Sequence, residues 1–220
     1  MNICIIIPGY NESRTIGQVV SNARKIVEHV IVIDDASKDN TAQIAHASGA
    51  IVLRHEINKG KGAALKTGFQ YAIEHNFDAV ITMDSDGQHD TNDIPVFLEA
   101  YKEMGSGIII GTRMSDISTM PFIRRLTNKL TSSIGSLIAR QKIEDSQSGF
   151  RLITCDVLRS VKLESDRYEM ESEILIKSSK AGFRIRSVPI RTIYGQEKSK
   201  INPIRDTYRF LRLLFRSLRW

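Results

Sequence analysis

The sequence predicts an α/β fold in which a mixed, mostly parallel β-sheet is covered by helices on both faces. In the first half of the 220-residue chain, short apolar runs recur at regular intervals, and segments with helical periodicity separate them. Strands that alternate with helices at this spacing are joined by right-handed crossovers, which make neighbouring strands parallel. With 41% hydrophobic and 25% charged residues, the composition is that of an ordinary globular domain.

The alternating elements can be located along the chain. Strands are expected at residues 3–7, 30–33, 51–53, 79–83 and 108–110, and helices at 15–28, 41–48, 62–75 and 93–102. The second half is less regular, and its expected elements are a helix at 122–139, a loop at 144–149, a strand at 150–153, a helix at 169–181 and a strand at 184–190. The tail after Pro203 has a helical pattern. We therefore expect a domain at 1–202 and an amphipathic C-terminal helix at 203–220.

Cysteine usage and hydropathy argue against several classes of protein. Cys4 and Cys155 lie far apart and match no metal-binding spacing, which argues against a disulfide framework or a zinc site and favours a reducing compartment. The chain begins without a signal peptide, and no stretch reaches the roughly 18 apolar residues that a membrane-spanning helix needs. We expect a cytoplasmic protein that can lie on the cytoplasmic face of a membrane without crossing it.

Positive charge is concentrated at the C-terminus. The formal net charge is +6, and residues 184–220 hold ten Lys or Arg against two acidic residues. A basic tail on a nearly neutral body predicts an anionic partner, either lipid or nucleic acid. A nucleic-acid-binding module is the more distant alternative, because the body has neither interleaved aromatic residues nor an RNA-binding motif.

Two residue types repeat along the tail with the same 4-3-4-3 spacing, one residue apart. The apolar set is Ile204, Tyr208, Leu211, Phe215 and Leu218, and the basic set is Arg205, Arg209, Arg212, Arg216 and Arg219. On a helix they form an apolar stripe flanked by an arginine stripe, which is typical of a helix on an anionic membrane surface. Packing on the protein's own body, or on the second subunit of a homodimer, explains the stripe equally well.

Polar residues directly follow the predicted strands, at positions 9–12, 34–35, 58–61, 84–89 and 111–113. Ligands of parallel sheets bind outside the carboxyl ends of the strands, so we expect the functional site where these segments meet. Asp84 and Asp86 stand one residue apart after such a strand. Their carboxylates predict a site for Mg²⁺ or Mn²⁺, which would screen a diphosphate. A solvated acidic loop is the alternative for an isolated DxD; the preceding strand and the following Gln88-His89 favour the metal.

Two further strand-end segments are compatible with nucleotide binding. One carboxylate of Asp34-Asp35 can accept hydrogen bonds from a base or a ribose hydroxyl, whereas Ser37 and Asp39 are explained by helix capping alone. The loop at 58–62 is basic and rich in glycine, which allows backbone to approach a phosphate closely. A plain turn before a helix explains that loop nearly as well.

Taken in order, these motifs are familiar. They read IIPGYNE, VIDDASKDNT, NKGKGAAL, MDSDGQH, GTR, DSQSGFR, SEILIK, SVPI and KSK. From residue 3 to about residue 200 the chain resembles the family-2 glycosyltransferases of the GT-A fold, and most closely their dolichyl-phosphate mannosyltransferase-like branch. It departs from the usual pattern at Gly9, where Thr is usual, at Ser85, where Ala is usual, and by one extra residue in the basic loop near 195–200.

The resemblance implies a nucleotide-sugar donor, a divalent metal and inversion at the anomeric carbon. The residues that would bind the nucleoside are Pro8, Tyr10, Glu12, Ile33 and Asp35. Those that would hold the metal and the diphosphate are Asp84, Asp86 and Gln88, together with Ser85 of the same motif; Lys198 and Lys200 are further donor-binding candidates. The catalytic candidates are Asp86, Arg113, Arg124 and Glu173.

A polyprenyl phosphate is the acceptor that this set of cations favours. A phosphate monoester has a second pKa near ~6 and arrives mostly ionised, so it needs cations to place it rather than a general base. Arg113, Arg124, Arg125, Lys198 and Lys200 can supply them, because an arginine fork gives two parallel hydrogen bonds to phosphate. Of these, Arg125 is the one best explained as a surface residue.

Acidic residues of the second half are candidates for contacts with the sugar. The spacing from Glu173 to Val188-Pro189 matches this glutamate to the family's acid, which could orient a sugar hydroxyl or an arginine. Glu169 and Glu171 of the same predicted helix are interpreted as solvated surface. Asp145 is the other candidate for a base or a sugar contact.

The sequence thus predicts an inverting, metal-dependent glycosyltransferase that uses GDP-mannose or UDP-glucose and a polyprenyl phosphate. Transfer to a saccharide or another hydroxyl acceptor is the alternative.

Overall fold

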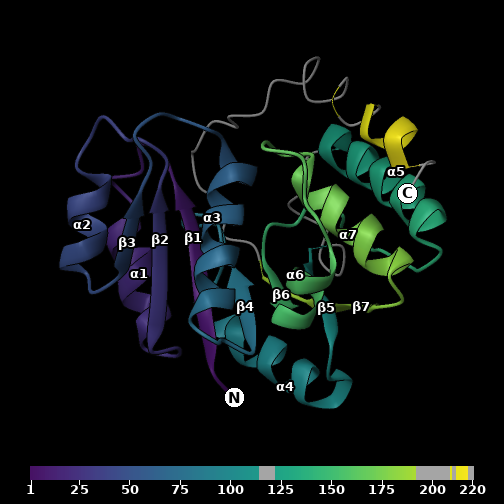
Figure 1. The fold of residues 1–220 in the computed structure, drawn as a ribbon, viewed down its shortest axis with the longest axis horizontal. Helices are drawn as coiled ribbons and strands as arrows, with labels where there is room; N and C mark the ends of the chain where they lie inside the picture. Colours follow the sequence, from purple (N-terminus) through teal and green to yellow (C-terminus); the bar gives the residue numbers. More distant parts are fainter. Residues whose placement is uncertain (114–121, 192–208, 210–211, 218–220) are drawn as a thin grey trace.

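The computed structural model describes residues 1–113, 122–191, 209 and 212–217, with residues 122–130 described by their backbone alone. A single sheet of seven strands runs through these residues in the order β3-β2-β1-β4-β6-β5-β7 (Figure 1). The strands are β1 (Ile3–Gly9), β2 (His29–Asp34), β3 (Ile51–Arg54), β4 (Ala79–Thr82), β5 (Gly107–Thr112), β6 (Arg151–Thr154) and β7 (Arg184–Pro189). The helices are α1 (Ile16–Arg24), α2 (Thr41–Ala47), α3 (Lys61–Glu74), α4 (Ile94–Met104), α5 (Phe122–Ala139), α6 (Cys155–Ser160) and α7 (Met170–Lys180), with a 3₁₀ turn η1 (Thr91–Asp93) before α4.

The sheet is mixed, because one strand runs against the others. β1 pairs in parallel with β2 and β4, β2 pairs in parallel with β3, and β5 pairs in parallel with β7. β6 lies between β4 and β5 and is antiparallel to both. Thr82 at the end of β4 therefore pairs with Arg151 at the start of β6. The segment that precedes β6 consequently reaches the same edge of the sheet as the carboxyl ends of β1, β2 and β4.

Both faces of the sheet are covered, as the continuous apolar strands predict. On one face, Ile5 and Ile7 of β1 pack with α1 and α4 residues such as Val20 and Phe97. On the other face, Cys4, Ile6 and Ile33 pack with α3, α6 and α7. β3 is an edge strand, and its Ile51 is 40% exposed.

The predicted fold class is confirmed, and every strand and helix expected between residues 3 and 190 is present, with bounds that differ by a few residues. Helix α6 was not anticipated, because six residues directly after a strand are too few to show helical periodicity. The antiparallel direction of β6 was not anticipated either.

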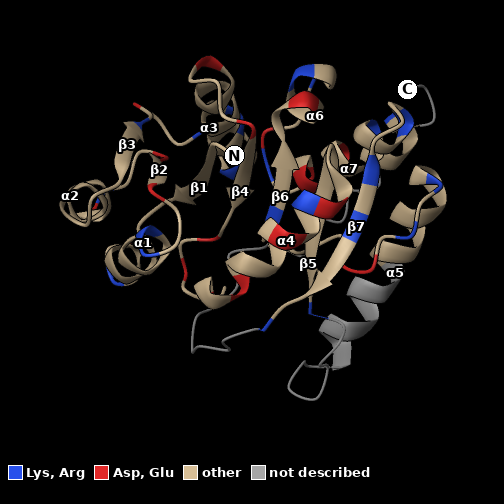
Figure 2. Ribbon diagram, turned by 90° about the horizontal axis from the view of Figure 1, so that it is seen from below, with Lys and Arg blue, Asp and Glu red and all other residues tan. Residues whose placement is uncertain are grey.

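Part of the C-terminal tail lies within the described residues and contacts the protein's own body. Residues 212–217 are helical, and the yellow segment lies beside α5 in Figure 1. Leu213 and Ser217 are buried. Lys180 of α7 donates a hydrogen bond to the Ser217 carbonyl, and Arg216 pairs with Glu164. Figure 2 shows α5 and the C-terminal end together at the β7 side of the sheet. Of the ten stripe positions, Arg209, Arg212, Phe215 and Arg216 are described, and the others lie outside the described residues.

Candidate active site

The central feature of the site is a lysine held between two carboxylates. Asp84 follows β4, Lys61 is the first residue of α3, and Glu171 lies in the first turn of α7. Lys61 Nζ lies 2.5 Å from Asp84 Oδ1 and 3.1 Å from Glu171 Oε1. The Tyr168 ring centroid lies 5.9 Å from the same nitrogen. Three segments distant in sequence therefore meet at one ammonium group.

Electrostatics set the charge states of this cluster. Burial alone would raise the pKa of Asp84, but the Lys61 ammonium, with help from His89 and Arg113, holds it at about 2. Burial alone would lower the pKa of Lys61, but Asp84 and Glu171 raise it above its ordinary value. Both groups are therefore charged at neutral pH. For Asp86, burial and the neighbouring Asp84 carboxylate raise the pKa.

The donor set around Asp84 and Asp86 fits a divalent cation that shares its shell with a ligand. Asp84 is partly exposed, with 29% of its side chain accessible, and the Asp86 carboxylate accepts a hydrogen bond from the Gln88 N–H. The described residues contain no cluster of three or more His, Cys, Asp or Glu arranged to hold a metal. Two carboxylates are sufficient for Mg²⁺, which usually takes one or two together with substrate phosphates and water. The site therefore fits a cation that arrives with a diphosphate.

The loop before β6 closes one side of the cluster. A Cβ added to Gly149 would lie 2.9 Å from Asp84 Oδ2 and 3.0 Å from Lys61 Nζ, so any larger residue would displace them. The Gly149 carbonyl accepts a 2.7 Å hydrogen bond from Thr82 Oγ1 at the end of β4. Glycine at position 149 is thus explained by the close approach of the lysine and the aspartate.

Arg151 stabilises this loop from within and was not singled out in the sequence. Its side chain is among the largest fully buried ones, and its guanidinium donates hydrogen bonds to the carbonyls of Ser146, Ser148 and Glu171. Burial lowers its pKa from the ordinary arginine value. Arg151 therefore connects the loop before β6 to the first turn of α7, where Glu171 contacts Lys61.

Arg113 and Asp145 form a two-pronged ion pair beside the cluster. Arg113 Nε lies 2.8 Å from Asp145 Oδ2, and Nη2 lies 2.9 Å from Oδ1. The Arg113 backbone N–H also donates to Asp145 Oδ2. Asp145 is fully buried, whereas Arg113 keeps part of its side chain accessible. The sequence proposed Asp145 as a base or a sugar contact; in the structure its oxygens accept hydrogen bonds from Arg113, and that role stays a prediction.

Asp35 organises the glycine-rich loop. Its Oδ1 lies 2.8 Å from the Lys59 N–H nitrogen and 2.7 Å from His55 Nδ1, and its Oδ2 accepts a 2.7 Å bond from the Gly60 N–H. His55 is held in turn by Thr67, 2.9 Å away. Asp34, the preceding acid, pairs with Arg54 at 3.0 Å. The two adjacent acids at this strand end therefore support the loop at 58–60 and the neighbouring β3.

A hollow of about 660 Å³ lies at the ends of β2 and β3, next to the loop at 58–60. Its lining residues are Tyr10, Ala36, Ser37, Lys38, Arg54, His55, Glu56, Ile57 and Asn58. Tyr10 is the only predicted nucleoside contact in this lining. Pro8 is buried at the end of β1, Ile33 is fully buried in the core, and the Glu12 N–H donates to Thr41 Oγ1.

Of the remaining predicted residues, Ser85 and Glu173 have described side chains, and three basic residues do not. Ser85 is buried and its carbonyl accepts a 2.7 Å bond from Thr15. Glu173 is fully buried; its oxygens accept the N–H groups of Glu164 and Ser165, and Lys177 lies 2.7 Å away. These contacts of Glu173 are separate from the lysine cluster, and the catalytic role of Glu173 stays a prediction. The side chain of Arg124, and all of Lys198 and Lys200, lie outside the described residues.

The interpretation of Glu171 as solvated surface is wrong. Glu171 is 9% exposed and pairs with Lys61, because α7 directs its first turn towards the end of β4. Helical periodicity alone could not show this, since the partner is 110 positions away in sequence. Lys61 was noticed only as part of a basic loop.

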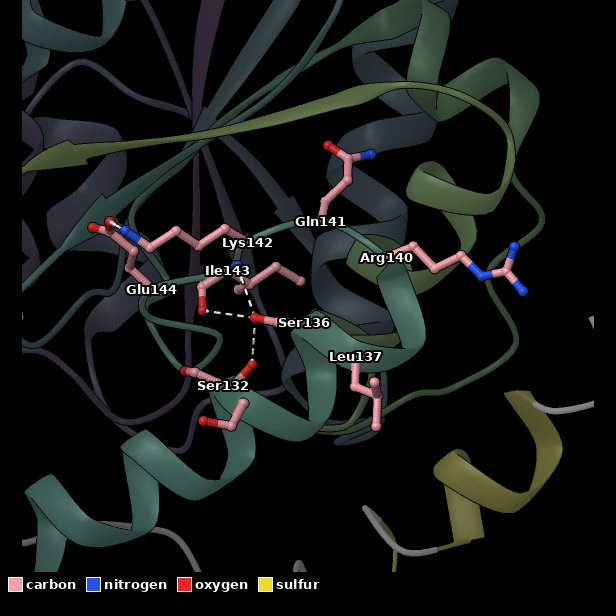
Figure 3. A pocket seen from close by; sticks show the side chains of 9 residues that line it. Ser132, Ser136, Leu137, Arg140, Gln141, Lys142, Ile143 and Glu144 are labelled. Carbon is pink, nitrogen blue, oxygen red and sulfur yellow. Dashed lines mark hydrogen bonds and ion pairs between the residues drawn. The ribbon is translucent and has the colours of Figure 1, made fainter.

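A second hollow, of about 630 Å³, lies at the C-terminal end of α5 (Figure 3). Its lining includes Ser132, Ser136, Leu137 and Arg140, and the Ser136 hydroxyl lies 2.7 Å from the Ser132 carbonyl oxygen and 3.1 Å from that of Ile143. None of the predicted site residues lines it.

The fold defines a class: it is the GT-A fold of glycosyltransferases. The fold matches that of glucosyl-3-phosphoglycerate synthase from Mycobacterium tuberculosis in complex with UDP, with a TM-score of 0.74 and 20% identity over 98% of this chain and 79% of that one. A second structure of that enzyme, with a TM-score of 0.69 and 20% identity over 99% and 78% of the two chains, contains Mn²⁺, UDP and glucosyl-3-phosphoglycerate.

The sequence comparisons identify the family. Residues 4–162 match the model of glycosyl transferase family 2, and this chain belongs to that family. It is similar to the UDP-N-acetylglucosamine–dolichyl-phosphate N-acetylglucosaminyltransferase of Methanococcus voltae, with 34% identity over 88% of this chain and 86% of the relative. The undecaprenyl-phosphate mannosyltransferase of Micrococcus luteus is 30% identical over 86% and 83%. The predicted enzyme class, the family and its polyprenyl-phosphate branch are therefore confirmed.

Proposed function

We propose that this glycosyltransferase transfers a hexose from a nucleotide-diphosphate sugar to the phosphate of a polyprenyl phosphate, with inversion and with Mg²⁺ or Mn²⁺ at Asp84 and Asp86. GDP-mannose and UDP-glucose are the donors we favour. The names of the relatives support the acceptor class, and they span more than one sugar.

The hydrogen bonds and ion pairs of the two candidate bases, Asp145 and Glu173, are the observation on which the choice of acceptor rests. A hydroxyl acceptor must lose its proton as the new bond forms, and a carboxylate usually accepts it. Asp145 is paired with Arg113, and Glu173 accepts two backbone N–H groups and faces Lys177. An acceptor phosphate arrives mostly ionised, with a second pKa near ~6, and requires no such base. The engaged state of both acids therefore favours a phosphate.

Different residues at the strand ends would bind the nucleoside, the phosphates and the cation. The hollow beside Tyr10 would take the nucleoside, and the glycine-rich loop held by Asp35 would lie beside the phosphates. Asp84 and Asp86 would hold the cation. When bound, the cation would stabilise the negative charge that develops on the leaving diphosphate. Arg113, held rigidly by Asp145, would place an anionic group next to the sugar, and Arg124, Lys198 and Lys200 remain further candidates for this role.

A polyprenyl acceptor requires the protein to work at a lipid surface. No helix in the described part of the chain is long and apolar enough to cross a bilayer. We therefore propose that the protein lies peripherally on the cytoplasmic face of an anionic membrane and that arginines of the tail contribute attraction of roughly 1 kcal/mol each. A homodimer is a further possibility that the stripe on the tail allows.

The decisive experiment offers the protein a panel of radiolabelled nucleotide-sugars and a polyprenyl phosphate in anionic vesicles with Mn²⁺. We expect label in the organic phase with at least one donor, and release of the sugar by mild acid, because a glycosyl phosphate is acid-labile. Omission of the polyprenyl phosphate and addition of EDTA are the controls. Label found only in water-soluble saccharide, when saccharide acceptors are added, would favour the hydroxyl-acceptor alternative.

A further inference from the structure

Lys61 occupies a position that the proposed function leaves unexplained. Its ammonium group lies 2.5 Å from a carboxylate oxygen of Asp84, which is one of the two proposed cation ligands. A divalent cation bound to that carboxylate would lie at about 2.0–2.1 Å from its oxygen if it were Mg²⁺. Two positive groups would then compete for one aspartate.

The lysine is held firmly where it is. Glu171 lies 3.1 Å away on the opposite helix, the Tyr168 ring lies below at 5.9 Å, and Gly149 leaves no space behind it. The pKa of Lys61 is raised by Asp84 and Glu171, so the group is charged. Its side chain is 19% exposed and that of Glu171 is 12% exposed, so solvent screens the contacts only in part.

We propose that Lys61 is a built-in counter-ion of the cation site: its ammonium neutralises Asp84 in the metal-free protein and yields this carboxylate to the divalent cation while remaining on Glu171. Lys61 is in this sense a positioning residue that sets the affinity for the metal. The inference rests on the metal dependence in the proposed function.

The counter-ion role has a physical consequence for the order of binding. An isolated cation must overcome the Asp84–Lys61 ion pair, whereas a cation that arrives with a diphosphate brings negative charge that compensates the displaced ammonium. The protein would thereby bind free metal weakly and the metal–nucleotide complex well. Glu171 matters because an ammonium that lost both carboxylates would be left partly buried without a partner.

The test measures Mn²⁺ binding by electron paramagnetic resonance, with no nucleotide and no sugar transfer. Lys61→Met should bind Mn²⁺ at least about tenfold more tightly than the parent protein, because one unit of positive charge is removed a few ångström from the ligand. Lys61→Arg keeps the charge and should bind like the parent. Lys66→Met is the matched control in the same helix, since Lys66 pairs with Asp166 at 2.5 Å instead. Equal or weaker Mn²⁺ binding by Lys61→Met overturns the proposal.

Glu171→Gln provides a second arm, whose first measurement, in the parent background, does not depend on the folding of Lys61→Met. In the parent background it should weaken Mn²⁺ binding, because Lys61 then has only Asp84 as partner. In the Lys61→Met background the same change should have a smaller effect, a non-additivity that a structural role of Glu171 would not produce. Unchanged Mn²⁺ binding by Glu171→Gln, or identical effects in the two backgrounds, contradicts the counter-ion role.

The outcomes separate this inference from the proposed function. A parent protein that binds Mn²⁺ while Lys61→Met shows no gain leaves the metal site intact and removes only the role of Lys61. If neither protein binds Mn²⁺, with or without UDP and GDP, the metal site and the counter-ion role both fall.

Discussion

The two halves of the sheet contribute to the site in different ways. In the half formed by β1 to β4, each polar group follows its own strand, as Asp35 follows β2 and Asp84 follows β4. In the half formed by β5 to β7, Arg113 still follows its strand β5, but the other contacts come from the loop before β6 and from the first turn of α7. The difference arises from one strand. β6 runs antiparallel, so its starting end, not its finishing end, lies at the ligand edge.

The first half of the sheet would therefore supply the groups that bind the cation, and the second half would mainly supply residues that hold those groups in place. Asp84 and Asp86 would act on the cation directly, whereas Arg151 and Glu171 act through other groups. Substitutions of the proposed cation ligands should therefore abolish transfer with little change in stability, and substitutions of the supporting residues should destabilise the fold.

The largest effect is expected from Asp86→Asn. It should lower sugar transfer by at least about a hundredfold, because a neutral amide cannot replace a carboxylate in the charge balance of a divalent cation. Thermal unfolding should stay close to that of the parent, since the Asp86 carboxylate accepts a hydrogen bond from the Gln88 N–H, and the amide oxygen of asparagine can still accept it. Asp90→Asn, close by in the sequence, is the control. Transfer at the parent rate by Asp86→Asn would remove the metal assignment.

Arg151→Met tests the supporting half. The change leaves the carbonyls of Ser146, Ser148 and Glu171 without their donor, inside the protein. Each unsatisfied buried group costs about 1–3 kcal/mol, so the free energy of unfolding should fall by roughly 3 kcal/mol or more. Urea unfolding measures the loss. Arg184→Met, at an exposed position of β7, should change it by less than about 0.5 kcal/mol. Equal stability of the two variants would show that the loop before β6 is held by other contacts.

The same comparison explains how far the sequence could predict the molecule. The alternation of apolar runs and helical segments is local, so the elements and the strand-end position of Asp84 follow from it. The direction of β6 is not local. Nothing in residues 150–153 shows which neighbour they pair with, and the strand-end rule applied to β6 directs attention to residue 155 instead of Gly149.

Lys61 and Glu171 show the same limit at the level of single side chains. In the sequence, Glu171 is interpreted as solvated surface because it lies among the charged and polar residues at the start of its helix. Its partner becomes visible only when α3 and α7 are placed together, which Gly62 permits: a Cβ at Gly62 would lie 2.6 Å from the Arg167 carbonyl oxygen. The predicted acid, Glu173, lies two residues further and points to the loop at 164–165.

The smallest effect is expected in the tail, where two neighbouring residues have opposite environments. Leu213 is 2% exposed, whereas Phe215 is 73% exposed. Phe215→Ala should leave the free energy of unfolding within about 0.5 kcal/mol of the parent, because the side chain contributes little to the core. It should weaken binding to anionic vesicles by roughly fivefold, which corresponds to about 1 kcal/mol for an aromatic side chain partly inserted among headgroups.

Leu213→Ala is the opposite control: it should lower stability by about 2 kcal/mol or more. Co-sedimentation with neutral and anionic vesicles at two salt concentrations measures the first effect, and urea unfolding measures the second. If Phe215→Ala binds vesicles as the parent does, the exposed side of the tail has another role, and sedimentation equilibrium would then test whether it forms the contact of a homodimer.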